Sequence, residues 1–388
     1  MNVVVTGIGA VSCYGIGASA LWDGLSKSKP GFTKVEAFDT SKYRNSLAGE
    51  CKDLLPFDRK TDRASMLLKY AVSEALEDAS LSPDNDDYRY ATVLSTNFSG
   101  GYASYKMFRE NTESINQPTD LDYWLSNPIG YAIEENKIPG PRYLVAHACA
   151  SSAVAVIEGL DLIRNNRADI VICGGAEALN PFDYSCMDTL RLITEKSIKP
   201  FDAERSGTLL GEGAGVIVIE SEKSALKRNV HVLGRILGGY SNNDGYHVVT
   251  PNEKGQAICL AKALEDANIK PVDVTYIKAH GTATIANDQV EAKAVEAVFE
   301  GHTKNLWCTS FKSSIGHLIR ASGIVEIIGA ISSIKYKQIP PTLNYEKPDP
   351  NMKVQVVANS AIKMPIKNIV TQSFGFGGNN AVVVIGEY

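Results

Sequence analysis

The stretch "YLVAHACASSAVAVIEGLDLI" at residues 143–163 contains a short apolar strand that runs directly into a helix, with Cys149 at the junction. Its apolar positions 153, 156, 157, 160 and 163 follow the period of an amphipathic helix. The cysteine has small neighbours on both sides, which leave room for a substrate: Ala148, Ala150, Ser151 and Ser152. We therefore predict a strand–turn–helix unit with an exposed thiol at the turn.

A thiol at the start of a helix has a chemical advantage. The free N–H groups of the first helical turn carry partial positive charge, which favours the reactive thiolate. The same N–H groups could also hold a developing oxyanion. The alternative interpretation is an unreactive cysteine buried at the start of a core helix. His147 is a poor candidate partner, because a residue two positions away rarely reaches across such a turn.

Outside this stretch, strand-length apolar runs alternate with helix-period segments, which predicts a layered α/β architecture. The glycine-rich turns "GEGAGVIVIESE" (211–222) and "GFGGNNAVVVIGEY" (375–388) each lead into a strand and form a weak internal echo. We interpret the echo as two similar halves, residues 1–228 and 229–388, fused into one unit without a linker. The strands are predicted at 2–6, 91–95, 142–146, 169–173, 215–220, 231–237, 274–279 and 381–386, and the helices at 62–79, 150–165, 255–267, 287–299 and after Gly316.

Composition excludes several classes of protein. The 388 residues are 44% hydrophobic and 21% charged, as is ordinary for a globular protein with a large core. A net charge of −5 argues against nucleic acid as the partner, and no apolar run is long enough for a membrane-spanning helix. The seven cysteines show no CxxC spacing, and the N-terminus has no basic leader. We therefore expect reduced thiols in the cytoplasm, without disulfides or a metal site.

Two histidines occupy settings like that of the cysteine. "VTYIKAHGTATIANDQVEAKAVEAVF" predicts a strand that ends near His280, followed by a loop of small residues and a helix. "LWCTSFKSSIGHLIRASGIVEIIGAI" repeats this order, with Lys312 and His317 at the loop and the helix start. A lone loop histidine is usually just solvated. Because ligands bind at strand ends in α/β sheets, two such histidines and Cys149 together predict one active site.

The motifs resemble those of β-ketoacyl-[acyl-carrier-protein] synthases, the decarboxylating condensing enzymes of fatty-acid and polyketide synthesis, and are closest to the synthase II type. The resemblance covers nearly the whole chain and rests on several motifs in the right order. It implies a five-layered αβαβα thiolase-like fold built of two similar halves. The matching segments are "ACAS", "GGAEA" (174–178), "PFDAERSGTLLGEGAG" (200–215), "DGYHVVTP" (244–251), "AHGTAT", "KSSIGHL" and "SFGFGGNNA" (373–381).

The resemblance also implies residue roles. Cys149 would be the acyl-accepting nucleophile, and His280 and His317 the pair that binds malonyl. Lys312 and Glu291 would form a supporting ion pair. Further implied roles are a gate and oxyanion hole at Phe376 with the Cys149 N–H, pantetheine binding by Thr282 and Thr284, an acyl pocket at Phe98 and Ser99, and carrier docking by Arg59, Lys60 and Arg63.

The implied partners are acyl- and malonyl-loaded carrier proteins and a second subunit, either an identical chain or a homologous chain-length factor. No cofactor is implied beyond the carrier's phosphopantetheine arm. Two residues depart from the family pattern near the site: His147, and Arg320, which stands where small residues are common. A thiolase is disfavoured because "SFGFGGNNA" lacks its second cysteine. A non-catalytic chain-length-factor-like subunit is the main alternative, and a purely structural protein is a further one.

Overall fold

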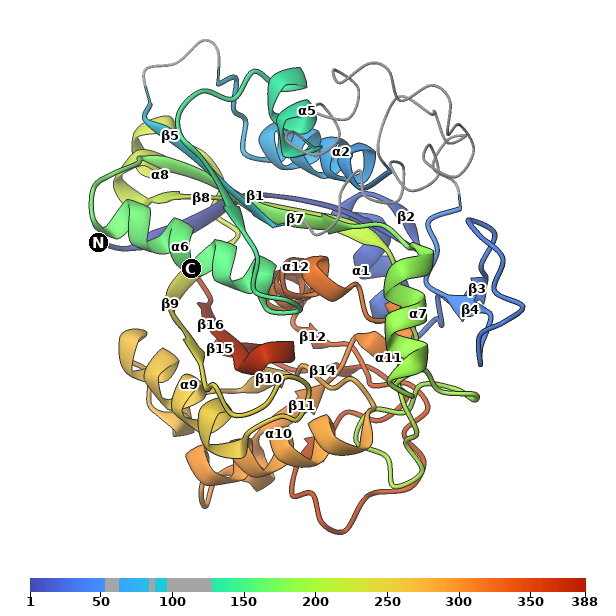
Figure 1. Ribbon diagram of the computed structural model, residues 1–388. Helices are drawn as coiled ribbons and strands as arrows, with labels where there is room; N and C mark the ends of the chain where they lie inside the picture. Colours follow the sequence, from blue (N-terminus) through green and yellow to red (C-terminus); the bar gives the residue numbers. More distant parts are fainter. Residues whose placement is uncertain (53–62, 84–87, 96–127) are drawn as a thin grey trace, which may run out of the picture.

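The computed structural model describes residues 1–52, 63–83, 88–95 and 128–388 (Figure 1). Most of its strands join one sheet of twelve strands in the order β13-β11-β10-β15-β16-β9-β1-β8-β7-β5-β6, with β2 beside β1. The main strands are β1 (Val3–Ser12), β5 (Tyr90–Ser95), β6 (Arg142–Val145), β7 (Ile170–Glu177), β8 (Gly213–Ser221), β9 (Gly234–Asn243), β10 (Tyr276–Lys278), β11 (Trp307–Thr309), β13 (Gln355–Val356), β15 (Asn368–Gly375) and β16 (Asn379–Gly386). The remaining strands have two residues each and are β2 (Gly15–Ile16), β3 (Thr33–Lys34), β4 (Leu47–Ala48), β12 (Gln338–Ile339) and β14 (Ile362–Lys363).

The helices follow most of the predicted helical segments. They are α1 (Ala18–Ser26), α2 (Arg63–Asp78), α5 (Pro128–Glu135), α6 (Ser151–Arg164), α7 (Pro181–Thr189), α8 (Glu222–Arg228), α9 (Glu253–Asp266), α10 (Ile285–Val298), α11 (Lys312–Ile315) and α12 (Ser322–Tyr336), with the short 3-10 turns η1 (Pro271–Asp273), η2 (Thr303–Asn305), η3 (Ile319–Ala321) and η4 (Phe376–Gly378). The ranges predicted from the sequence missed α1, α5, α7, α8 and β15. They also began β9 too early, because the apolar run at 231–233 precedes the strand.

The sheet repeats one topology twice. The order β1-β8-β7-β5-β6 of the first half corresponds to β9-β16-β15-β10-β11 of the second. In each half the first two pairings are antiparallel and the next two parallel. The halves meet where β1 pairs antiparallel with β9. The boundary predicted at residues 228 and 229 lies between α8 and β9.

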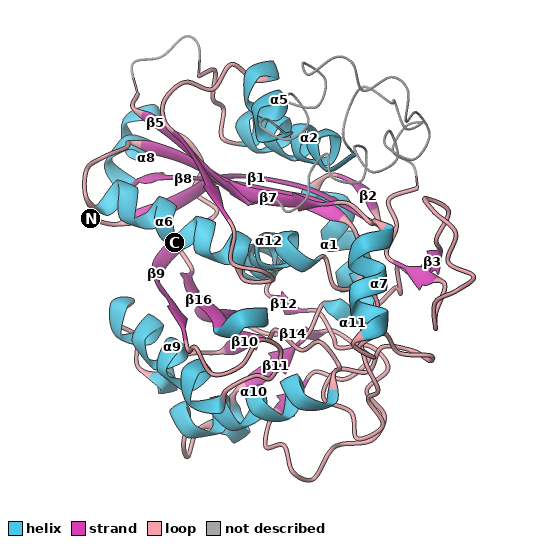
Figure 2. Cartoon of the chain, in the orientation of Figure 1, coloured by secondary structure: helices cyan, strands magenta, loops and turns pink. Residues whose placement is uncertain are grey.

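Five layers follow from how helices cover the two half-sheets (Figure 2). Helices α6 and α12 form the middle layer, since α6 packs on β5 and β7 as well as β9 and β16, and α12 packs on β8 and β15. Helix α2 covers the outer face of β1 and β8, while α9 covers β9 and β16. The αβαβα fold of the thiolase type is thereby confirmed. The apolar stretch of α12, buried from Ser322 through Ile334, is explained by its position between two sheets.

No helix in the described ranges combines the length and the apolar character needed to cross a membrane. In the same ranges, no cluster of three or more His, Cys, Asp or Glu side chains is placed to hold a metal ion.

Candidate active site

The turn at Cys149 is shaped by its small neighbours. Ala148 adopts a left-handed backbone conformation with φ of 47°, which turns the chain sharply between β6 and α6. The Ser151 hydroxyl fastens the turn, since its Oγ accepts from the His147 N–H at 2.7 Å and donates to the Ala148 carbonyl at 2.6 Å. The Cys149 side chain is 8% exposed, so the thiol lies inside the molecule and not at an exposed turn as predicted. The His147 side chain is exposed.

One pocket brings the predicted residues together. Cys149 comes from the start of α6, His280 from the loop after β10, and His317 from the segment between α11 and η3. These three side chains line the same cavity of about 100 Å³. Other lining residues are Met187, Leu192, Val248, Val249, Thr250, Gln256, Thr282, Thr284, Asn287, Phe374 and Phe376.

His280 is fixed through its backbone. Glu291 on α10 accepts hydrogen bonds from the N–H groups of His280 at 2.6 Å and Gly281 at 2.8 Å. Two residues after Gly281, Ala283 donates its N–H to Asp288 on the same helix. Two buried carboxylates of α10 therefore hold the "AHGTAT" loop against the end of β10.

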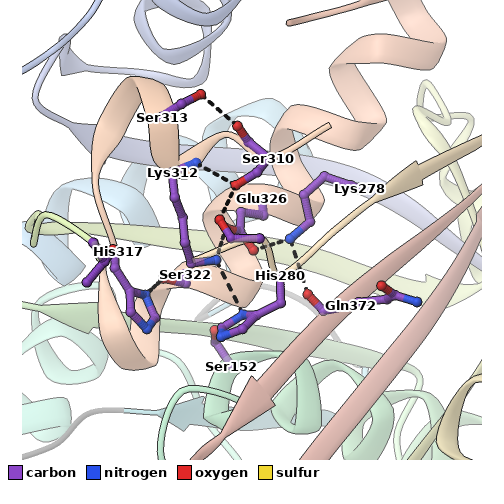
Figure 3. A network of polar contacts seen from close by, with 12 residues as sticks. Ser152, Lys278, His280, Ser310, Lys312, Ser313, His317, Ser322, Glu326 and Gln372 are labelled. Atoms are coloured by element: carbon purple, nitrogen blue, oxygen red, sulfur yellow. Dashed lines mark hydrogen bonds and ion pairs between the residues drawn. The ribbon is translucent and has the colours of Figure 1, made fainter. Parts of the chain in front are cut away.

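The predicted Lys312–Glu291 ion pair is wrong. The Lys312 ammonium instead pairs with Glu326 on α12, with 2.6 Å between Nζ and Oε1 (Figure 3). The carboxylate of Glu291 is occupied by the loop N–H groups and by the Asn287 amide. Helix α12 lies in the middle layer, and the packing of that layer places Glu326 beside Lys312.

Lys312 also determines which nitrogen of His280 carries the proton. Its Nζ lies 3.4 Å from His280 Nδ1. Because an ammonium is only a donor, Nδ1 must be the acceptor, and the ring proton then sits on Nε2. His280 can therefore donate a hydrogen bond from Nε2.

The imidazole rings of His317 and His280 are nearly perpendicular, with 5.3 Å between their centroids and 84° between their planes. The Nδ1 of His317 lies 2.9 Å from the Ser322 hydroxyl at the start of α12. Gly316 precedes His317 with φ of +82°, where an added Cβ would lie 2.5 Å from the Leu210 carbonyl oxygen. Only glycine suits that position, and it allows the His317 N–H to bond Leu209 at 2.8 Å.

Burial and buried lysines determine the protonation of the histidine pair. Burial lowers the pKa of both His280 and His317 well below the usual value, and the positive charge of Lys312 lowers it further. Both rings are therefore neutral at pH 7. Burial also raises the pKa of the Cys149 thiol to about 11, an effect that Arg320 and Lys312 oppose through their positive charge.

The C-terminal glycine-rich segment closes the site near Cys149. An added Cβ at Gly375 would come within 3.0 Å of the Cys149 backbone nitrogen, so the absence of a side chain permits this close approach. Phe376 follows and lines the pocket. Its part in an oxyanion hole remains a prediction.

The comparisons with known proteins agree with this arrangement. Residues 1–225 match the family model "Beta-ketoacyl synthase, N-terminal domain", and residues 233–346 match "Beta-ketoacyl synthase, C-terminal domain". The chain belongs to the β-ketoacyl synthase family. It is thus a ketosynthase, a C–C bond-forming acyltransferase.

Two curated relatives illustrate the likeness. The chloroplastic 3-oxoacyl-[acyl-carrier-protein] synthase I of Hordeum vulgare is 32% identical over 100% of this chain and 89% of its own length. The 3-oxoacyl-[acyl-carrier-protein] synthase 2 of Synechocystis sp. is 30% identical over 100% of this chain and 98% of its own.

Two solved structures show the same fold. The ishigamide ketosynthase/chain length factor superposes with a TM-score of 0.93 at 30% identity, covering 100% of this chain and 99% of that one. A type II polyketide synthase acyl-carrier protein in complex with its ketosynthase, bound to the hexaketide, gives a TM-score of 0.91 at 27% identity with the same coverage.

The predicted docking surface of the ketosynthase needs a correction. Arg63 begins α2, but its guanidinium forms an ion pair with the fully buried Glu212, with 2.8 Å between Nε and Oε2. It also donates to the Cys51 carbonyl. Arg63 is thus committed to the interior and is wrongly assigned to carrier docking. Arg59, Lys60, Phe98 and Ser99 lie outside the described residues.

Arg320, the departure from the family pattern, forms its own buried cluster. Its Nη1 lies 3.1 Å from Glu177 Oε2 at the end of β7 and 3.9 Å from Asp183 Oδ1 on α7. Burial raises the pKa of Glu177 to about 8 despite this contact. The ketosynthase therefore carries a partly buried cation whose charge acts on the Cys149 thiol.

Sequence reasoning missed three polar residues of the site: Glu326, Ser322 and Lys278. The sequence contained a detectable signal for two of these residues, Glu326 and Lys278. Glu326 interrupts the apolar run "SGIVEIIGAI", and Lys278 interrupts "VTYIKA". A single charge within an otherwise apolar segment predicts a buried charge that needs a partner. The partner of each could not be chosen without the three-dimensional arrangement of the strands and helices.

Proposed function

We propose that this ketosynthase condenses malonyl groups with an acyl chain held on Cys149, in fatty-acid or polyketide biosynthesis. The observation that carries the proposal is the convergence of Cys149, His280 and His317 on one pocket from three separate segments. Acyl and malonyl groups would arrive as carrier-protein thioesters, whose arm passes Thr282 and Thr284 at the pocket wall. A non-catalytic partner subunit would not need the three reactive groups in this arrangement.

In the first half-reaction, the Cys149 sulfur attacks the thioester carbonyl of the acyl carrier. A new C–S bond forms, the bond to the carrier sulfur breaks, and the thiol proton leaves with the carrier thiol. The N–H groups of Cys149 and Phe376 would hold the oxyanion of the tetrahedral intermediate. The positive charges of Arg320 and Lys312 assist by favouring the thiolate.

In the second half-reaction, malonyl carrier loses its carboxylate as CO₂, and the electron pair forms an enolate. Neutral His280, and His317 beside it, would donate hydrogen bonds to the enolate oxygen. Such oxyanion donors are typically worth about 3–4 kcal/mol in the transition state. The enolate carbon then attacks the acyl-Cys149 carbonyl, and the thiolate leaves and takes up one proton. These two half-reactions balance without a metal or an organic cofactor other than the phosphopantetheine arm of the carrier protein.

A second subunit is part of the proposal. Strand β6 forms one edge of the described sheet, and it leaves Leu144 65% exposed and Tyr143 38% exposed. An exposed apolar edge strand tends to pair with another chain. Because β6 leads directly to Cys149, we propose that an identical chain or a homologous chain-length factor packs there. A cytoplasmic location also remains a prediction.

Mixing the purified protein with acyl-loaded and malonyl-loaded carrier tests the proposed reaction. Mass spectrometry of the carrier should show a 3-oxoacyl product two carbons longer than the acyl donor, together with release of CO₂. A protein that releases no CO₂ and forms no product from a panel of acyl carriers would instead behave as a non-catalytic subunit.

A further inference from the structure

Lys278 is a fully buried lysine at the end of β10, two residues before His280. Its ammonium contacts Oε2 of Glu326, while Lys312 contacts Oε1 of the same carboxylate (Figure 3). The Lys278 ammonium also donates a hydrogen bond to the Gln372 carbonyl oxygen of β15, at 3.3 Å. Two lysines from different elements therefore share the carboxylate of Glu326, and one of them, Lys312, also contacts the His280 ring.

The charges of this cluster do not balance. Two ammonium groups and one carboxylate leave one net positive charge in the interior. A buried ion pair contributes little to stability relative to a well-packed apolar substitute, because desolvation offsets the attraction. A second lysine that adds uncompensated charge costs more. Stability therefore gives no reason for Lys278, whereas its position beside the histidine pair does.

The other groups around the pair do not cancel this charge. Glu291 on α10 faces the His280 loop, yet burial raises its pKa to about 7, so its negative charge is incomplete near neutral pH. Arg320 on η3 adds a further positive charge on the His317 side. Other buried ionisable groups on neighbouring segments include Asp288 on α10, Tyr276 on β10, Cys308 on β11, Cys149 before α6 and Glu177 at the end of β7.

We infer that Lys278 is a positioning residue for the condensation: it fixes Glu326 and, through that carboxylate, holds Lys312 beside His280. The inference rests on the proposed function for its catalytic consequence. Burial lowers the pKa of Lys278 itself to about 8, which leaves it mostly protonated at pH 7. Its positive charge adds to the effect of burial and of Lys312, which together disfavour a proton on either ring. His280 then reaches the enolate as an N–H donor in the tautomer that Lys312 selects.

The test compares Lys278→Met with the wild-type chain by NMR titration of the histidine rings, with assignments from His280→Asn and His317→Asn. Removing one like charge should raise the pKa of at least one of the two rings by about one unit. Lys353→Met is the matched control, because Lys353 is an exposed lysine that pairs with Glu296. The control should leave both rings unchanged.

The kinetic readout is malonyl decarboxylation. For Lys278→Met we expect kcat to fall about tenfold with little change in KM, as for an interaction made in the transition state. Acylation of Cys149 should be nearly unaffected. If Lys278→Met does not fold, Lys278→Gln serves the same comparison, since it also removes the charge.

Histidines that titrate as in the wild type, with an unchanged kcat and only a lower Tm, would overturn the inference and make Lys278 a structural residue. Failure of the proposed function looks different: the wild-type chain would then neither acylate Cys149 nor decarboxylate malonyl carrier. The NMR titration would still decide the role of Lys278 in that case.

Discussion

At the scale of single residues, ionisation of the Cys149 thiol depends on a balance between burial and charge. Burial opposes ionisation of Cys149, and the positive charges of Arg320 and Lys312 favour it. Arg320→Met should therefore raise the thiol pKa further. Since only the thiolate reacts, alkylation by iodoacetamide at a fixed pH should slow, and its pH profile should move upward. Arg167→Met, at an exposed arginine, is the control. An unshifted profile would show that Arg320 is too well neutralised by Glu177 to act on Cys149.

The histidines should act in one step of the reaction. His280→Ala and His317→Ala should each slow malonyl decarboxylation by about 10²-fold or more, as expected for loss of an oxyanion donor. Acylation of Cys149, followed by mass spectrometry, should suffer less. A packing role would give the opposite pattern, with a lowered Tm and nearly normal decarboxylation.

The sequence was sufficient to predict that Cys149, His280 and His317 come together, because each follows a strand-like run in a strand–loop–helix segment, and the structure places all three in one pocket. It was not sufficient to pair them correctly with their neighbours. Glu291 and Glu326 both lie on helices near Lys312, and only the packing of the middle layer decides between them. Burial of the Cys149 thiol was likewise invisible, since it depends on segments far away in the sequence, such as "GFGG".

At the scale of elements, the start of α2 shows that a basic residue expected at the surface can instead pair with a buried carboxylate. "RKTDR" predicted a docking face, but Arg63 reaches inward to Glu212. Arg63→Met should therefore lower the free energy of unfolding by about 3 kcal/mol, because it leaves a buried carboxylate without its cation. The measurement is chemical denaturation.

The control for Arg63 is Lys27→Met, which breaks the exposed pair with Asp23 and should cost less than about 1 kcal/mol. The KM for acyl carrier should stay near the wild-type value in Arg63→Met. A large rise in that KM without loss of stability would restore Arg63 as a docking residue.

Elements with a clear apolar pattern were predictable, and elements without one were not. Helix α6 and strand β8 carry strong periodic or continuous apolar signals, and the structure places them where expected. Strand β15 was missed because "NIVTQSFG" mixes polar residues into a buried strand, and their burial is set by neighbouring strands. The two-residue strands have no periodicity to detect.

At the scale of the whole molecule, the subunit contact proposed at the edge strand β6 would link assembly to the site. Leu144→Asp should weaken the proposed subunit contact, because it would place a charge in an apolar interface. Analytical ultracentrifugation should show a shift toward monomer, while circular dichroism stays unchanged. Ile258→Asp, at an exposed apolar position on α9, is the control. A variant that sediments as the wild type would place the contact elsewhere.

The repeated topology explains why the site lies where it does. The parallel strands β5 and β6 end in register in the first half, as β10 and β11 do in the second. Residues that follow those ends line one pocket. Cys149 follows β6 of the first half, and His280 follows β10 of the second. The internal echo in the sequence pointed to this duplication, but the junction itself could be seen only in the fold.

The central claim is that Cys149 carries the acyl chain and passes it to malonyl. It is tested most directly by incubating the protein with acyl carrier, digesting it, and locating the acyl mass by peptide mapping. The account predicts acylation of the peptide containing Cys149 alone, and complete loss of that mass when malonyl carrier is added. Acylation at another residue, or an acyl-Cys149 that persists in the presence of malonyl carrier, would contradict it.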